Sequence, residues 1–144
     1  MTRVDFYIVD EGSREASLTL ACRIAEKAVL KDHEVLINAA SDTDCRRLDQ
    51  LLWTFSQGSF LPHRLLSDAA GPGEGEPVLI GSGQEPRDGA WDLLINLAAD
   101  VPGFFSRFNR VAELVAAEED SRAAGRERFR YYRERGYELR THHV

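Results

Sequence analysis

The sequence predicts an α/β domain in which helices flank both faces of a mostly parallel sheet. Two observations lead to this fold class. Apolar, strand-like runs alternate with helix-like segments in the N-terminal half, an order typical of parallel strands joined by helical crossovers. Residues 34–40 also form a nearly continuous apolar run, which suits a strand covered on both faces. We therefore expect a Rossmann-like fold, and the 144 residues are most simply one domain, 1–144.

Composition narrows the classes of function. The net charge of −6 argues against nonspecific binding of nucleic acid by the whole surface, but it leaves room for a local basic patch. No apolar run approaches the ~20 residues of a membrane helix, and the first residues lack a signal-peptide pattern, so we expect a cytoplasmic protein without membrane contact. Cys22 and Cys45 form no C-x-x-C pair, which favours reduced, half-buried thiols and no metal.

The N-terminal half contains two predicted strand–helix pairs. Residues 4–9 are rich in β-branched and aromatic side chains, which favour a buried strand. An amphipathic helix is expected to follow it and to end near Lys31. After the strand at 34–40, Ser41 and the acidic residues behind it are suitable caps for a helix that leads to Trp53.

The C-terminal half begins with a stretch rich in glycine. Residues 67–76 contain three glycines and a proline, which predict a flexible surface loop. Strands are predicted at 77–80 and 93–97, and a short helix at 104–108. Residues 110–116 fit a strand and a helix almost equally well.

The final segment is a helix followed by a short tail. Three acidic residues from Glu118 onward suit the first turn of a helix, which continues to about Arg135 and ends at a glycine. Residues 137–144 are expected to be partly frayed. The histidines of this tail, His142 and His143, could chelate a metal, but we favour a solvated end.

Residues 48–65 combine an amphipathic helix with a stiff apolar loop. Apolar side chains recur at three- and four-residue spacing up to Phe55, after which glycine and proline break the helix. The side chains of interest are Trp53, Phe60, Leu61, Pro62 and His63. They form either a protein-binding patch, because aromatic anchors dominate many interfaces, or a part of the core, where large apolar side chains usually lie.

The last helix carries a concentrated positive charge. Residues 126–135 contain five arginines and two glutamates, a local charge of +3 in an acidic chain. The residues that share one helical face are Arg126, Phe129, Arg130 and Arg133. Arginine binds carboxylates through a planar fork, so this face suits an acidic peptide with a hydrophobic last residue and a free carboxylate. A solvated face with intrahelical ion pairs, or contact with DNA phosphates, are the alternatives.

Motifs of catalysis and of nucleotide binding are missing. The sequence has no G-x-x-x-x-G-K-[ST] phosphate loop, and the turn after the first strand carries Asp10 and Glu11, which would repel a pyrophosphate. These two carboxylates could act as an acid–base pair but more often cap a helix or face solvent. We therefore expect no active site and no cofactor. The alternative function is a Rossmann-like enzyme that binds a small molecule or nucleotide.

One block resembles a known family. Leu-Asp-x-x-Leu-Trp at 48–53, followed by Ser-Phe-x-Pro-His at 59–63, resembles the chi subunit of bacterial DNA polymerase III, a part of the clamp-loader assembly. The likeness extends from Phe6 to Leu139. It includes weaker matches at 5–8, 92–97 and 126–133.

The resemblance implies a non-catalytic accessory subunit that acts in DNA replication. It implies that Arg126, Phe129, Arg130 and Arg133 bind the acidic, Phe-ended tail of single-stranded-DNA-binding protein. In the familiar pattern, a tyrosine stands in place of Phe129 and a lysine in place of Arg130. The ring and the charge are kept, so binding is expected with altered geometry.

The resemblance also implies a second partner. The block with Trp53, Phe60, Leu61, Pro62 and His63 would bind the psi subunit, and hence the clamp loader, or a helicase-like protein that competes for the same surface in some bacteria. DNA would be reached only through these partners. The resemblance places a strand at 110–116, which we adopt.

Overall fold

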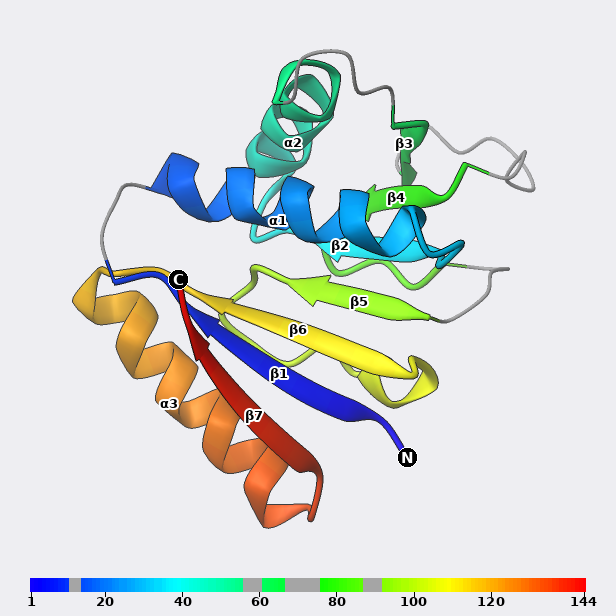
Figure 1. Cartoon of the computed structure of the whole chain (residues 1–144). Coiled ribbons are helices and arrows are strands. Elements are labelled where there is room, and N and C mark those ends of the chain that lie inside the picture. Colours follow the sequence, from blue (N-terminus) through cyan, green and yellow to red (C-terminus); the bar gives the residue numbers. More distant parts are fainter. Residues whose placement is uncertain (11–13, 56–60, 67–75, 87–91) are drawn as a thin grey trace.

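The computed structural model describes residues 1–10, 14–55, 61–66, 76–86 and 92–144. Within them, a single seven-stranded sheet has the strand order β3-β4-β2-β5-β6-β1-β7 (Figure 1). The strands are β1 (Arg3–Ile8), β2 (Val35–Asn38), β3 (His63–Leu65), β4 (Val78–Gly81), β5 (Leu93–Asn96), β6 (Arg110–Val115) and β7 (Glu138–His143). Every pairing is parallel, so the predicted α/β class with a Rossmann-like sheet is confirmed.

Helices cover both faces of this sheet. Helices α1 (Arg14–Val29) and α2 (Asp42–Thr54) pack on one face, and helix α3 (Glu119–Glu134) and the 3-10 turn η2 (Phe105–Arg107) pack on the other (Figure 1). Successive side chains of a strand point to opposite faces, and the two cores follow this rule. Ile37 belongs to the core beneath α1 and α2, whereas its neighbour Leu36 belongs to the core beneath α3.

Local signals placed most elements correctly. Ser41 caps α2, and its hydroxyl accepts a hydrogen bond from the Asp44 amide at 3.2 Å. The ambiguous segment at 110–116 is a strand, because it lies in the middle of the sheet between β5 and β1. Gly136 follows α3 with a φ of 80°, a left-handed conformation that glycine adopts without strain.

The prediction of a partly frayed tail at 137–144 is wrong for most of its length. Residues 138–143 form β7, which pairs with β1 along all six of its residues. Leu139 packs against the core beneath α3. On the opposite face, the His142 ring stacks on Tyr7 with centroids 4.9 Å apart, and its Nε2 lies 3.1 Å from the buried carboxylate of Asp5. Alternate side chains therefore attach the strand to both faces.

Strand β3 was also missed, because its three residues follow Pro62 directly and carry no alternating pattern of their own. Phe60, and residues 67–75 of the predicted glycine-rich loop, lie outside the described residues.

Both cysteines are free thiols, as predicted, and both are buried rather than half-buried. Burial raises the pKa of Cys22 to about 12 and that of Cys45 to about 11, so neither is a reactive thiolate at neutral pH. Among the described residues, no helix is long and apolar enough to cross a membrane, and no group of three or more metal-binding side chains is found.

Candidate functional site

Helix α3 presents two different surfaces. Gly125, Arg128 and Tyr132 are buried against the sheet. Arg126 lies on the exposed side, and Phe129 is half-buried between the two surfaces. Arg128 is one of the five arginines on which the predicted positive charge of residues 126–135 rests. Its guanidinium is buried, so it adds nothing to the surface charge.

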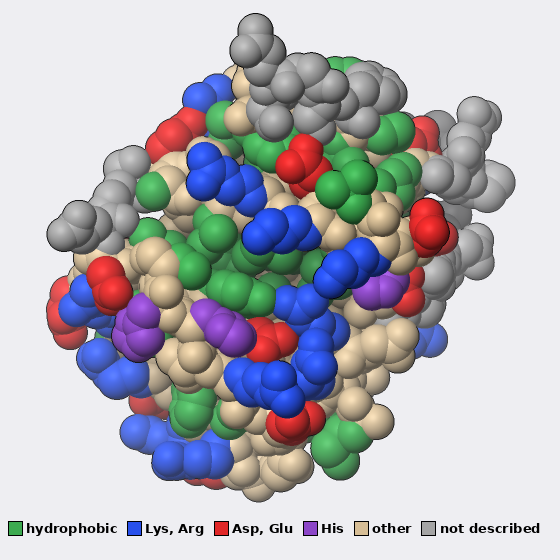
Figure 2. Space-filling view, viewed as in Figure 1, with side chains coloured by type: hydrophobic (Ala, Val, Ile, Leu, Met, Phe, Trp, Pro, Cys, Tyr) green, Lys and Arg blue, Asp and Glu red, His purple; other side chains and the backbone are tan. Residues whose placement is uncertain are grey.

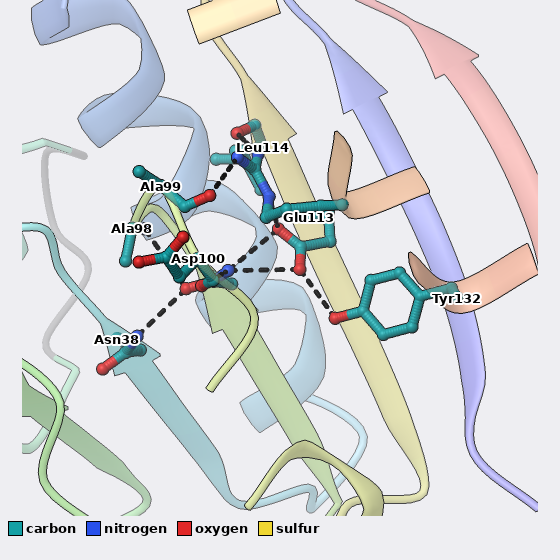
Figure 3. Close-up of polar contacts among 9 residues, drawn as sticks. Asn38, Ala98, Ala99, Asp100, Glu113, Leu114 and Tyr132 are labelled. Carbon is teal, nitrogen blue, oxygen red and sulfur yellow. Dashed lines mark hydrogen bonds and ion pairs between the residues drawn. The ribbon is translucent and has the colours of Figure 1, made fainter. Parts of the chain in front are cut away.

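A buried ion pair fixes the inner surface of α3 (Figure 3). Glu113 of β6 is fully buried, and its Oε1 accepts a hydrogen bond from Arg128 Nε at 2.8 Å, while its Oε2 accepts one from the Tyr132 hydroxyl at 2.7 Å. Arg128 donates further hydrogen bonds to the backbone carbonyls of Ala99 at 3.0 Å and Leu114 at 3.3 Å. The guanidinium thus connects α3 with β6 and with the segment that follows β5.

Two asparagines extend this network across the sheet. Asn96 Nδ2 donates to both oxygens of Glu113, at 3.0 and 3.1 Å, and Asn38 Nδ2 donates to Asn96 Oδ1 at 3.0 Å. Burial raises the pKa of Glu113, while Arg128 and the hydrogen-bond donors oppose this shift. Burial, together with the Glu113 carboxylate, also raises the pKa of Tyr132, which keeps its hydroxyl protonated as a donor. The side chains of the network bond to one another in a chain and to nearby backbone groups, which suits a structural role in positioning α3.

A pocket of about 390 Å³ lies between α3 and the carboxyl ends of β1, β6 and β7. Its apolar walls are Phe6, Ile8, Val115 and Phe129. Phe6 and Phe129 meet edge to face with ring centroids 5.2 Å apart. Arg122 and Arg126 add two guanidinium groups to the lining. The arrangement can hold an apolar group next to a negative charge.

The predicted residues of the last helix divide between this pocket and the surface beyond it. Arg126 and Phe129 line the pocket, whereas Arg130 and Arg133 are exposed outside its lining. Arg126 lies 3.4 Å from Glu119, and Arg130 lies 3.3 Å from Glu127 in an exposed pair. Such pairs contribute little to stability, so these guanidinium groups can exchange partners at small cost.

Sequence reasoning missed the other residues of the pocket. Arg122 stands one helical turn before Arg126, and this spacing could have indicated it. Val115, Thr141 and His143 come from strands, and no local pattern connects them with the helix.

The residues predicted to bind the psi subunit differ in their exposure. Trp53, in the last turn of α2, is 53% exposed, and its ring lies 4.6 Å from the ring of His63 between centroids. The His63 side chain is fully buried, with Nδ1 2.6 Å from the Leu61 carbonyl oxygen and Nε2 3.1 Å from the Asp49 carbonyl oxygen. Leu61 belongs to the core, and Pro62 is half-buried. Trp53 is thus the outward-facing member among those that the structure describes.

The middle of the same carboxyl edge, at the ends of β2, β5 and β6, is where ligands often bind in this fold class, and it has a different character from the α3 pocket. A pocket of about 340 Å³ lies there, with Glu118 and Asp120 in its lining. Arg14 also lines it but forms an ion pair with the buried carboxylate of Asp44. The acidic lining disfavours a phosphate group, in agreement with the missing phosphate loop.

The sequence matches the family model described as "DNA polymerase III chi subunit, HolC" over residues 1–140. The chain belongs to this chi family. It is 43% identical to the DNA polymerase III subunit chi of Pseudomonas aeruginosa, over 100% of this chain and 98% of the relative. It is 32% identical to the Escherichia coli protein of the same name, over 98% and 97% of the two chains. It is 29% identical to the one from Haemophilus influenzae, over 96% and 95%.

The predicted resemblance to the chi subunit is therefore confirmed, and it covers nearly the whole chain, as expected from Phe6 to Leu139. In this chi-family chain, the pocket beside α3 and the exposed Trp53 are the two candidate sites.

The buried ion pair should dominate the stability of the α3 region. We expect Glu113→Gln to lower the free energy of unfolding by about 3–5 kcal/mol, because it leaves the Arg128 charge buried without a counter-charge. Urea unfolding measures this change. The matched control is Glu138→Gln, which removes an exposed carboxylate 3.4 Å from Arg140 and should change stability by less than about 0.5 kcal/mol. Equal effects of the two substitutions would contradict the assignment.

Gly125 should resist a side chain, because α3 approaches β6 closely there. A Cβ at this position would lie 2.8 Å and 3.0 Å from the two methyl groups of Val115, a side chain with a stiff χ1. Replacing an exposed helical glycine by alanine normally stabilises a helix by about 1 kcal/mol. We instead expect Gly125→Ala to destabilise the fold by about 1–3 kcal/mol in urea unfolding.

The reverse change at an exposed position of the same helix, Ala123→Gly, calibrates the ordinary helix propensity. If Gly125→Ala stabilised the protein as propensity alone predicts, the close approach of α3 to β6 would be refuted.

Proposed function

We propose that this chi-family chain is a non-catalytic accessory subunit of DNA polymerase III, and that its α3 pocket binds the acidic, Phe-ended tail of single-stranded-DNA-binding protein. The observation that carries the proposal is one apolar pocket lined by two arginines, Arg122 and Arg126. A terminal phenylalanine has an apolar ring and a free carboxylate within a few bonds of each other. The pocket matches both groups.

The energetics favour such a ligand. Burying a phenylalanine side chain contributes roughly 1.5–3 kcal/mol, and a charge-assisted hydrogen bond to a carboxylate contributes about as much. Arg130 and Arg133 continue the positive surface along α3, where acidic residues upstream of the phenylalanine would lie. Arg126 and Arg130 now face carboxylates of their own helix in exposed pairs, which a peptide carboxylate can replace.

Trp53 marks the proposed psi-subunit surface, together with Pro62 and with Phe60, which lies outside the described residues. Leu61 and His63 would support this surface from inside. Leu61 belongs to the core, and the buried His63 ring packs on Trp53. An exposed tryptophan at a helix end is a typical hot-spot residue of protein interfaces. A helicase-like partner would use the same surface.

The two surfaces lie on helices that cover opposite faces of the sheet, α2 and α3 (Figure 1). This arrangement supports simultaneous binding of both partners. The chain would then bridge the clamp loader and single-stranded-DNA-binding protein in the cytoplasm during DNA replication. Each contact can be weak, because tethering raises the effective concentration of the second partner.

The tail site is tested with a peptide that ends in Asp-Ile-Pro-Phe. We expect Arg126→Ala or Arg130→Ala to weaken binding by about 1.5–3 kcal/mol without unfolding the domain, because each removes a guanidinium group that would pair with a carboxylate of the peptide. Isothermal titration calorimetry measures the affinity. Arg23→Ala, an exposed arginine of α1 on the other face of the sheet, is the control and should bind as the unchanged protein does. Unaltered binding in both α3 variants would eliminate the site.

The psi surface is tested at Trp53. We expect Trp53→Ala to reduce co-purification with the psi subunit, with a loss of about 2 kcal/mol or more in binding. Because the ring is 53% exposed, stability should fall by far less than the ~3–5 kcal/mol of a buried aromatic residue. Leu30→Ala, a change at an apolar side chain that is 79% exposed, controls for loss of surface hydrophobicity. A destabilised protein that still binds psi would assign Trp53 to the core. The affinity for the tail peptide should be the same in the unchanged protein and in both variants.

A further inference from the structure

Strand β7 is an edge strand that borders the α3 pocket. Among the described residues it is the last strand of the sheet and pairs only with β1. The Val144 amide donates to the Ile8 carbonyl at 3.0 Å, so the backbone groups of Val144 point toward β1. Because the N–H and C=O of one residue point to the same side and alternate along a strand, those of Leu139, Thr141 and His143 point away from β1, toward the free edge.

The same residues face the α3 side of the sheet. Thr141 and His143 line the α3 pocket with their side chains, and Leu139 packs in the core beneath α3. Any chain segment that places an apolar group in this pocket therefore passes beside backbone groups that can hydrogen-bond to it. A pocket next to an open strand edge is the usual arrangement where a peptide is added to a sheet.

The charges around this edge select the kind of segment. Arg122 and Arg126 line the pocket together with His143 of β7. Arg140 lies on the opposite face of the sheet, 3.4 Å from Glu138 of the same strand. In Figure 2, blue and purple side chains gather over β7 and α3. The one carboxylate in the pocket lining, Asp10, lies 3.3 Å from His143 Nδ1. A segment rich in aspartate or glutamate complements this surface, whereas a basic one would be repelled.

We propose that β7 binds the acidic segment that precedes the anchored aromatic residue, as an eighth strand of the sheet. This inference rests on the proposed tail site and specifies how the rest of the tail is held. A segment of about five or six residues matches the length of β7 at ~3.3 Å per residue. Its side chains on the α3 face would meet the exposed arginines, and its backbone would bond to Thr141 and His143.

Backbone methylation of the peptide tests the added strand. The probes are an acidic peptide of about nine residues that ends in Asp-Ile-Pro-Phe, and versions with a single N-methyl group at successive upstream residues. Only every second amide of an added strand faces β7, so affinity should fall about threefold to tenfold at alternate positions and stay unchanged at those between. The unaffected positions are the matched controls. A segment held only by charge would show no alternation.

Amide hydrogen exchange of the full chain gives a second readout. In the free protein the amides of Thr141 and His143 should exchange rapidly, and the peptide should protect both. Peptide binding without alternation and without this protection would overturn the added strand but leave the tail site intact. No binding of any peptide would instead refute the tail site itself. Protection that rises with protein concentration, together with a doubled mass, would overturn the proposal in favour of a second copy of the chain at the edge.

Discussion

The buried contact between Glu113 and Arg128 is the constraint on which the candidate site depends. An unpaired charge in the core is costly, so the two groups must meet whenever the chain is folded. Arg128 extends from α3 and Glu113 from the central part of the sheet, so the contact fixes both the position of the helix and its rotation. The Tyr132 hydroxyl, one helical turn later, binds the second carboxylate oxygen and prevents rotation about the first bond. Few other rotations of α3 would allow both hydrogen bonds to Glu113.

This fixed rotation explains how one helix can serve two purposes. Residues one position apart in an α-helix are turned by roughly 100°. With Arg128 directed into the sheet, Phe129 falls at the border of the core, where it meets Phe6 and forms a wall of the pocket. Arg126, two positions before Arg128, then points outward at the mouth. Gly125 lets the helix approach Val115 closely enough for the strand to contribute to the same pocket.

Sequence patterns predicted the fold better than the site. The strands at 77–80 and 93–97 were found because central parallel strands are apolar on both faces, and the helix caps were found because they are local. Strand β7 escaped because its residues are mostly polar and its pairing partner lies more than a hundred positions away in the sequence. Glu113 and Arg128 escaped for a related reason: a charged residue is usually solvated, and nothing local indicates that one is buried against another. The arginines and Phe129 were found from helical spacing, but the pocket combines α3 with three strands and could not be read from any one of them.

The overall charge of −6 has a consequence for how an acidic ligand would bind. At long range the net negative charge of the whole protein repels a peptide rich in carboxylates, but in physiological salt this repulsion is screened beyond about 8 Å. Attraction therefore has to arise locally, where Arg122 and Arg126 of α3 line the pocket. An apolar anchor suits this situation, since its contribution does not depend on salt or on the distant charges. The combination of a small basic surface with a hydrophobic pocket allows an acidic protein to hold an acidic partner, and it confines that partner to one edge of the sheet.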